Sequence, residues 1–251
     1  MRIHLSDDAE AMSAAAALHA ERVLADTIAA NGQARVIAAT GNSQLGFLHR
    51  LATSTRVDWS RVELFHLDEY IGLSDGHPAG FRRVLREHFV DRTGIPIFHE
   101  LDGNGDVDAV LRTIGDAITR APIDVAFVGI GENAHLAFND PPADFATTEP
   151  YLVVALDEAC RRQQVGEGWF PSIEAVPTHA ISMSVRQILA AREILVIVPD
   201  RRKAAAVAAV LTGPITPDVP ASILREHANA TLYLDAASAS LTAPAARSGP
   251  S

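Results

Sequence analysis

Short apolar runs alternate with helical patterns along nearly the whole chain, and this alternation constrains the fold more than any other feature. Runs closed by turn signals predict buried strands at 2–5, 34–39, 62–67, 123–129, 151–156, 178–183, 193–198 and 231–234. The intervening stretches predict helices at 43–53, 79–91, 105–120, 185–191 and 200–212, after a first helix that Ser6 caps. Strands and helices that alternate in this way predict an α/β fold, with an open, mostly parallel, doubly wound sheet and helices on both faces.

The composition limits the classes of protein to which the chain can belong. Its 251 residues, 48% of them hydrophobic, suffice for one large core, and we expect a single domain over 1–236. The small residues and prolines of 237–251 predict a disordered tail. A net charge of −10 excludes nonspecific binding to nucleic acid, which requires a basic face.

The cysteine content and the hydropathy narrow the classes further. Cys160 is the single cysteine, which excludes an intrachain disulfide, and the ten histidines show no metal-ligand spacing, so we expect no metal. The first residues are acidic and carry no apolar leader, and no run of 18 apolar residues occurs. We therefore expect a cytoplasmic protein that binds no membrane.

The segment V-G-I-G-E-N-A-H-L-A-F-N-D-P-P at 128–142 carries the clearest sign of catalysis. It follows an apolar strand and brings His135 and Asp140 to that strand's carboxyl end. A histidine and a carboxylate can move protons on a small substrate, and open α/β sheets bind ligands at this edge. Gly129, Gly131 and Ala134 also match a dinucleotide fingerprint, but Pro141 and Pro142 interrupt the long helix that this fingerprint opens.

Three other strand ends carry candidate site residues, each with a plainer alternative. Thr40-Gly41-Asn42-Ser43 can cradle a phosphate at a helix start or form an ordinary turn, and the Lys-Ser/Thr pair of a nucleotide P-loop is absent after Gly46. Asp68-Glu69 can supply a general base or a helix cap. Lys203 can bind an anion or belong to a solvated basic turn.

Taken together, these segments resemble the glucosamine-6-phosphate deaminase family. The resemblance rests on T-G-N-S at 40–43, L-D-E-Y-I-G-L at 67–73, G-I-G-E-N-A-H-L-A-F-N-D at 129–140 and Lys203, and it extends from about residue 10 to 235. The sister branch, 6-phosphogluconolactonase, shares the sheet and the glycine-histidine loop. It typically has arginine after the Asp-Glu pair, where this chain has Tyr70, so the deaminase side is favoured.

The resemblance implies a reaction and a role for each site residue. The substrate is a small amino-sugar 6-phosphate, which is opened, isomerised from aldose to ketose and deaminated without a cofactor. Asp68 is the base and His135 opens the ring, while Asn133 and Asp140 complete the histidine relay. The substrate-binding residues are Thr40, Gly41, Asn42, Ser43, Glu69, Gly131, Ala134 and Lys203.

Several positions depart from the family pattern. Asn133 stands where the family usually has aspartate, and we expect it to accept an N–H from His135 and fix its tautomer. Asp140 replaces a glutamate. Gly168 replaces a phosphate-binding arginine, for which we expect Arg161 or Arg162 to substitute. The long carboxyl-terminal extension of allosteric members is missing, which argues against their regulation.

The sequence therefore predicts an enzyme and leaves alternatives open. The main hypothesis is a glucosamine-6-phosphate deaminase or isomerase, with a 6-phosphogluconolactonase-like hydrolase as an alternative. A second alternative is a non-catalytic sugar-phosphate sensor, because Asn133 and Gly168 depart from the family pattern. The sequence is compatible with more than one sugar epimer and with either a monomer or a homo-oligomer.

Overall fold

A seven-stranded sheet forms the centre of the computed structural model, which describes residues 1–242. All its neighbouring strands are parallel, in the order β1-β10-β9-β6-β2-β3-β5. Their bounds are β1 (Arg2–Ser6), β2 (Ala34–Ala38), β3 (Val62–His66), β5 (Ile97–His99), β6 (Val125–Val128), β9 (Glu193–Val198) and β10 (Ala230–Asp235). The predicted parallel α/β fold is confirmed.

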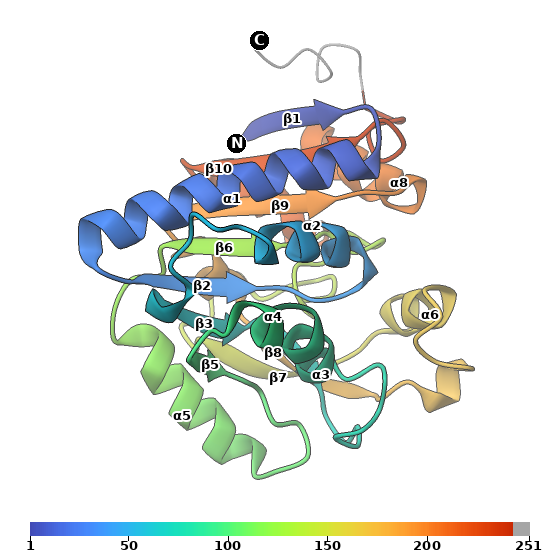
Figure 1. Ribbon diagram of the computed structural model, residues 1–251. Helices are drawn as coiled ribbons and strands as arrows, with labels where there is room; N and C mark the ends of the chain where they lie inside the picture. Colours follow the sequence, from blue (N-terminus) through green and yellow to red (C-terminus); the bar gives the residue numbers. More distant parts are fainter. Residues whose placement is uncertain (243–251) are drawn as a thin grey trace.

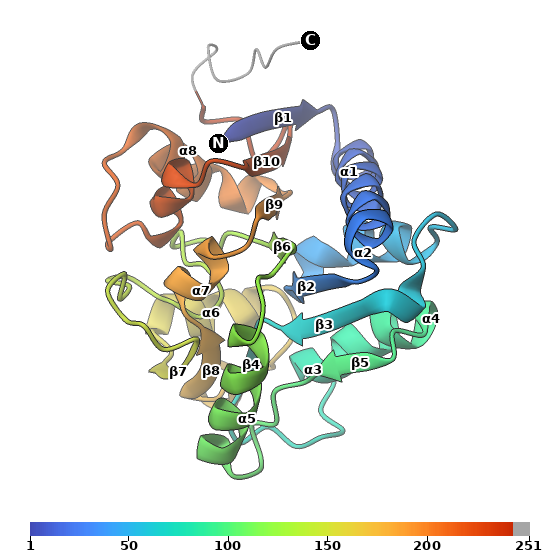
Figure 2. The same ribbon diagram turned by 90° about the vertical axis from the view of Figure 1, so that its left-hand side faces the viewer.

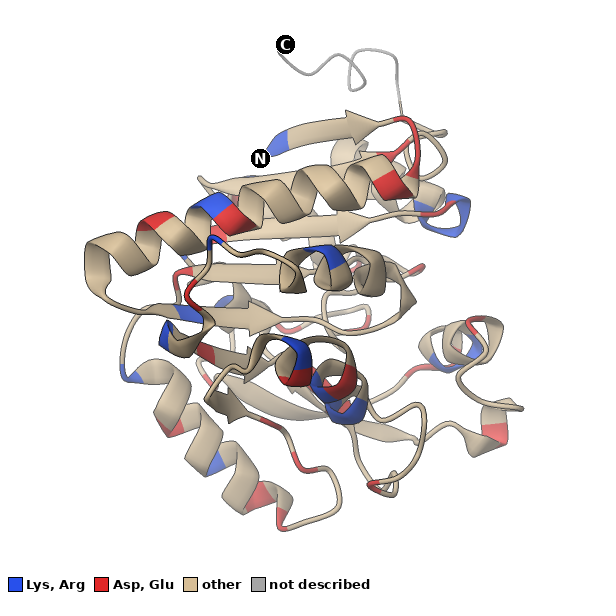
Figure 3. Ribbon diagram, viewed as in Figure 1, with Lys and Arg blue, Asp and Glu red and all other residues tan. Residues whose placement is uncertain are grey.

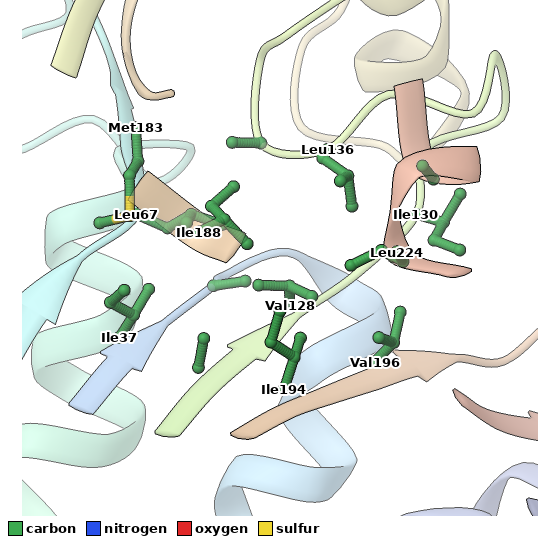
Figure 4. Packing of buried hydrophobic residues seen from close by; sticks show 14 of the residues in the cluster. Ile37, Leu67, Val128, Ile130, Leu136, Met183, Ile188, Ile194, Val196 and Leu224 are labelled. Carbon is green, nitrogen blue, oxygen red and sulfur yellow. The ribbon is translucent and has the colours of Figure 1, made fainter. Parts of the chain in front are cut away.

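Helices cover both faces of this sheet (Figure 2). The helices are α1 (Ala9–Asn31), α2 (Asn42–Ala52), α3 (Phe81–Leu85), α4 (Asp91–Thr93), α5 (Val107–Thr119), α6 (Glu158–Gly166), α7 (Val185–Leu189) and α8 (Ala204–Thr212). Alternate strand residues face opposite layers: Val36 packs with α1 and α2, whereas Ile37 belongs to the other core. Figure 4 shows this second core, where Val128 and Ile194 meet Ile188 of α7.

The neighbouring strands β2 and β6 mark the point where the sheet reverses its winding. From β2 the chain adds β3 and then β5 on one side, and it returns to place β6 and β9 on the other. At such a switch point the loops after neighbouring strands diverge and leave a crevice at the carboxyl edge of the sheet. The architecture thus fixes where a ligand can bind before any side chain is considered.

Two predicted strands do not join the parallel sheet. The segments at 151–156 and 178–183 form β7 (Tyr151–Ala155) and β8 (His179–Met183), which pair antiparallel with each other. A short strand, β4 (Asp68–Tyr70), pairs antiparallel with β8 and completes a three-stranded sheet. Burial alternates along β7 because one face is solvated, as is typical of antiparallel strands.

The chain termini also differ in part from the predictions. The first helix begins at Ala9, because the Asp8 side chain, and not Ser6, accepts the N–H of Ala11 at 2.8 Å. Residues 236–242 form turns in which Ser238 and Ala239 are buried, so the expected disordered tail does not begin at 237. The remainder of that tail lies outside the described residues. Within 1–242, no helix has the length and apolarity that a membrane crossing requires.

Candidate active site

A pocket lies at the carboxyl edge of the parallel sheet, at the switch point between β2 and β6. The segments that follow β2, β3, β6 and β9 all line it, and α6 lies beyond the same edge (Figure 1). Its lining includes seven of the residues selected from the sequence: Thr40, Gly41, Ser43, Asp68, Gly131, His135 and Lys203. Segments far apart in the chain thus meet in one hollow at the edge where α/β sheets bind ligands.

The adjacent carboxylates Asp68 and Glu69 point in opposite directions, because successive residues of a strand face opposite sides. Asp68 lines the pocket. Glu69 instead accepts the backbone N–H groups of Tyr70, Phe81 and Arg82, at 2.8, 3.1 and 2.6 Å. The two alternatives left open by the sequence are therefore both realised: Asp68 is available for chemistry, and Glu69 holds the start of α3 and is not placed to bind substrate.

Burial changes the protonation of both carboxyl groups. Asp68 is fully enclosed, and this desolvation, together with the negative charge of Glu69, raises its pKa to about 8. Burial also raises the pKa of Glu69 to about 7, although the three backbone N–H groups oppose the shift. A carboxylate with a pKa near neutrality can both take up and release a proton during a reaction.

The imidazole of His135 packs so closely on Gly131 that the ring leaves no room for a side chain there. A Cβ on Gly131 would be 2.2 Å from the His135 Nε2 atom. On the other side of the ring, Nδ1 lies 3.0 Å from Asp140 Oδ1. Burial opposes ionisation of Asp140, but hydrogen bonds from His135, Asn133 and the Asp157 backbone outweigh it and lower its pKa. Because an ionised carboxylate only accepts, it favours the Nδ1–H tautomer and leaves Nε2 for the substrate.

Asn133 does not fix this tautomer as predicted, because its side chain contacts the backbone N–H of His135 and not the imidazole ring. Its Oδ1 accepts the His135 backbone N–H at 3.1 Å. Its Nδ2 donates to Asp140 Oδ1 at 3.0 Å and to Asp157 Oδ2 at 3.4 Å. The side chain therefore lies between two carboxylates, and an amide can donate to both where an aspartate could not.

We expect Asn133→Asp to lower kcat/KM by about tenfold or more and to lower the melting temperature. The substitution removes the donated hydrogen bonds and places a third carboxylate beside Asp140 and Asp157, which raises the free energy of the folded state. Steady-state kinetics and thermal unfolding measure the two effects. Asn31→Asp, at an exposed position at the end of α1, is the matched control. Unchanged kinetics in Asn133→Asp would show that its amide group is not needed.

His135, Asp140 and Cys160 are the groups of the described residues that lie close enough together to share a metal ion, with their ligand atoms within 4.8 Å. Burial, followed by the charges of Asp140 and Asp157, raises the pKa of the Cys160 thiol well above its usual range. Metal ligation requires the thiolate, which this environment strongly disfavours. The arrangement fits a neutral thiol beside the Asp140 carboxylate.

The glycine turn after β2 forms one end of the pocket. Gly41 has a φ of +101°, in the region that favours glycine, and α2 starts directly after it. Among the described residues, no side chain caps this helix start, so its first amides can receive an anion. Thr40 Oγ1 and Gln44 Oε1 are buried here without a hydrogen-bond partner in the described part of the chain. The Thr40 hydroxyl and the free amides can donate hydrogen bonds to an anion, whereas Gln44 Oε1 can only accept one.

Lys203 enters the same end of the pocket from the turn after β9. This turn, η4 (Arg201–Lys203), is the short blue stretch at the carboxyl edge in Figure 3. The Lys203 side chain is almost fully buried, and its Nζ lies 3.5 Å from Glu167 Oε1. Lys203 thus lines the same pocket as the glycine turn, as predicted, but the Glu167 carboxylate lies beside it.

Arg161 and Arg162 do not substitute for the missing arginine. Arg161 donates to the backbone carbonyls of Ile173 and Val176, and Arg162 pairs with Glu158 in solvent. Neither lines the pocket. On a helix these side chains point away from the pocket-facing side that Gln163 and Gln164 occupy, a distinction that distance along the sequence does not reveal.

Asn42 and Ala134 also lie outside the pocket lining. The Asn42 side chain donates to the Glu167 carbonyl at 3.1 Å, and so joins the glycine turn to the end of α6. Ala134 has a φ of +67°, and its carbonyl accepts the N–H of Ala221. Ala134 thus shapes the pocket from behind, whereas Asn42 lines a neighbouring hollow and supplies the first backbone amide of α2.

Several pocket residues were not selected from the sequence: Gln44, Gly129, Gln163, Gln164 and Glu167. The last three lie on α6 or directly after it, and this helix was not predicted. Its sequence E-A-C-R-R-Q-Q-V-G is polar and short and has no apolar stripe. The available signal was Asp157, whose side chain caps the helix by accepting the Cys160 N–H at 2.6 Å.

The pocket and the fold match those of one protein family. The sequence profile of the glucosamine-6-phosphate isomerases/6-phosphogluconolactonase family matches residues 7–233. The chain belongs to this family. The match includes every residue that lines the pocket and all of the parallel sheet except β1 and the end of β10.

Curated relatives in this family are named glucosamine-6-phosphate deaminase. The protein from Exiguobacterium sibiricum is 37% identical over 218 residues, which cover 83% of this chain and 81% of the relative. The protein from Clostridium acetobutylicum is 32% identical over 248 residues, which cover 96% of this chain and all of the relative. This chain therefore has nearly the full extent of such a deaminase.

Solved structures agree with this assignment. A monomeric glucosamine-6-phosphate deaminase superimposes with a TM-score of 0.86 at 30% identity, covering 96% of this chain and 100% of that one. A 6-phosphogluconolactonase from Shewanella baltica superimposes with a TM-score of 0.78 at 18% identity, covering 94% of this chain and 97% of that one. The second likeness shows a shared fold.

Proposed function

We propose that this enzyme is a glucosamine-6-phosphate deaminase, which converts glucosamine 6-phosphate and water to fructose 6-phosphate and ammonia. One observation carries the proposal: Asp68 and His135, whose Nδ1 is held by Asp140 from behind, line the same pocket as Lys203 and the glycine turn. Proton-transfer groups at one end and anion-binding groups at the other suit a phosphorylated sugar that reacts near C1 and C2.

His135 acts on the ring form of the substrate. With Nδ1 held by Asp140, its Nε2 relays a proton between the C1 hydroxyl and the ring oxygen, so that the C1–O5 bond breaks and the open aldehyde forms. The fixed imidazole orientation lets one ring nitrogen serve both oxygen atoms. Asp140 stabilises the imidazolium that exists between the two transfers.

Asp68 acts on the open chain. It takes the proton from C2 to give an enolamine and returns a proton to C1, which leaves an imine at C2. Water adds to this imine, and ammonia leaves to give the 2-ketose phosphate. A base with a pKa raised to about 8 binds protons strongly enough to remove one from carbon and still releases it again.

The phosphate binds at the opposite end, which positions C1 and C2. The first amides of α2 donate hydrogen bonds, and Lys203 supplies positive charge. Binding energy at this remote group aligns the reacting carbons with Asp68 and His135. A cytoplasmic location and the oligomeric state remain predictions.

Ammonia release from glucosamine 6-phosphate by the purified protein tests the proposal. We expect ammonia and fructose 6-phosphate to form in equal amounts, as measured by coupled enzyme assays. Hydrolysis of 6-phosphogluconolactone without ammonia release would instead assign the lactonase activity. Binding of glucosamine 6-phosphate without turnover would assign a sensor, and either result would contradict the proposed deaminase.

A further inference from the structure

A buried ion pair occupies the end of the pocket that the proposed function assigns to the phosphate. Lys203 Nζ and Glu167 Oε1 are 3.5 Å apart, and their side chains are 4% and 6% exposed. Gln163 Nε2 donates to the same Glu167 oxygen at 2.8 Å, and Gln163 Oε1 accepts the Glu132 backbone N–H at 2.9 Å. The carboxylate of Glu167 is thus held in place beside the cation.

This pair changes the charge that a ligand meets. Lys203 and Glu167 both line the pocket, and their charges cancel. The next residue, Gly168, has a φ of +84°, a backbone conformation that favours glycine and disfavours a long side chain. The phosphate end of this pocket therefore contains one lysine that is already neutralised by a carboxylate.

We infer that Glu167 is a specificity-determining residue that competes with the substrate's phosphate for Lys203. This inference rests on the proposed function of the pocket. A phosphate that binds Lys203 must approach the Glu167 carboxylate or displace it, and like charges at such short range raise the free energy of the complex. Glu167 thus weakens the binding of phosphorylated ligands and sets which of them bind strongly enough to be retained.

The structure provides space into which the displaced carboxylate can move. A second hollow lies on the far side of the ion pair, and Ser43, Glu167 and Lys203 line both hollows. Arg201 and Arg202 line this second hollow, and the charge of Glu167 already contributes to the raised pKa of Arg202. Arg202 already pairs with Asp200 at 3.2 Å, so a carboxylate that leaves Lys203 would share this cation with a second carboxylate. Displacement of Glu167 by phosphate therefore costs free energy, which lowers the affinity of the pocket for phosphate.

Inorganic phosphate binding, measured by calorimetry on the purified protein, tests this role without requiring turnover. Glu167→Gln removes the charge and keeps an oxygen that can accept the Gln163 hydrogen bond. We expect it to bind phosphate about tenfold more tightly than the wild type, equivalent to about 1.4 kcal/mol. Its KM for glucosamine 6-phosphate should fall in parallel.

Three further variants make the test specific. Glu158→Gln removes an exposed carboxylate from the same helix and should leave phosphate affinity unchanged. Lys203→Gln should abolish phosphate binding, which locates the anion. Glu167→Asp, which withdraws the carboxylate by about 1.5 Å, should give an intermediate affinity and replaces Glu167→Gln if that variant does not fold.

The outcomes separate this inference from the proposed function. A gain in affinity of less than about threefold in Glu167→Gln, or phosphate binding that persists in Lys203→Gln, overturns the role of Glu167. Absence of ammonia release by the wild type overturns the deaminase proposal alone, because phosphate affinity does not depend on turnover.

Discussion

Asp68→Asn should lower kcat by about 1,000-fold or more while it changes the affinity for the sugar phosphate by less than about tenfold. The substitution keeps the size and polarity of the side chain but removes the group that accepts the C2 proton. Steady-state kinetics and calorimetric binding of glucosamine 6-phosphate measure the two effects. Asp91→Asn, an exposed position on α4, is the matched control and should be indistinguishable from the wild type. Retention of more than a tenth of the rate would assign the base elsewhere.

The pH dependence provides a second measurement of the same group. Only the ionised form of Asp68 accepts a proton, and burial raises its pKa to about 8. We therefore expect kcat/KM of the wild type to rise with pH and to level off above about pH 8. A profile that levels off near pH 5 would show that another carboxylate, of ordinary pKa, is the base.

As the pH rises, the stability of the folded wild type should fall while its activity rises. Between the ordinary pKa of 3.8 and the folded-state value of about 8, the folded protein keeps a proton on Asp68 that the unfolded chain releases. Stability is therefore lost as the pH rises through this interval, and an asparagine avoids that loss. We expect Asp68→Asn to raise the free energy of unfolding at high pH by about 2 kcal/mol or more, since each pKa unit corresponds to about 1.4 kcal/mol. Denaturant unfolding at two pH values would also show that the inactive variant is folded.

His135→Gln should lower kcat/KM for cyclic glucosamine 6-phosphate by about 100-fold or more, because it removes the ring nitrogen that relays the proton during ring opening. Binding of 2-amino-2-deoxyglucitol 6-phosphate, which has no ring to open, should change by less than about threefold. Kinetics on the substrate and calorimetry on this acyclic ligand separate ring opening from binding.

His179→Gln is the control for the loss of an imidazole. His179 is exposed at the start of β8 and lies outside the pocket, so its replacement should leave both measurements unchanged. If His135→Gln weakens the acyclic ligand as much as it slows the reaction, His135 binds or positions the open chain and has no special role in ring opening.

The sequence by itself determined the features that depend on local patterns. Alternating apolar runs and helical stretches predicted the parallel sheet, because each strand of such a sheet is buried on both faces. Strand ends with glycine or polar residues predicted where ligands meet the sheet, and Gly41, Asp68, His135 and Lys203 do line one pocket. These residues lie in the segments that leave the carboxyl ends of neighbouring parallel strands, so the topology brings them together.

The tertiary structure decided the direction of side chains and the partners they meet across the chain. Asp68 and Glu69 are equivalent in the sequence, yet the strand sends one into the pocket and the other to the start of α3. Arg161 was selected for its charge, whereas Glu167, on the unpredicted side of the pocket, is the residue that reaches Lys203. Such contacts join residues about 36 positions apart, and no local pattern encodes them. The sequence predicted that Asp68 and His135, the groups proposed to be catalytic, share one site, but the charge balance of the pocket depended on packing α6 against the sheet edge.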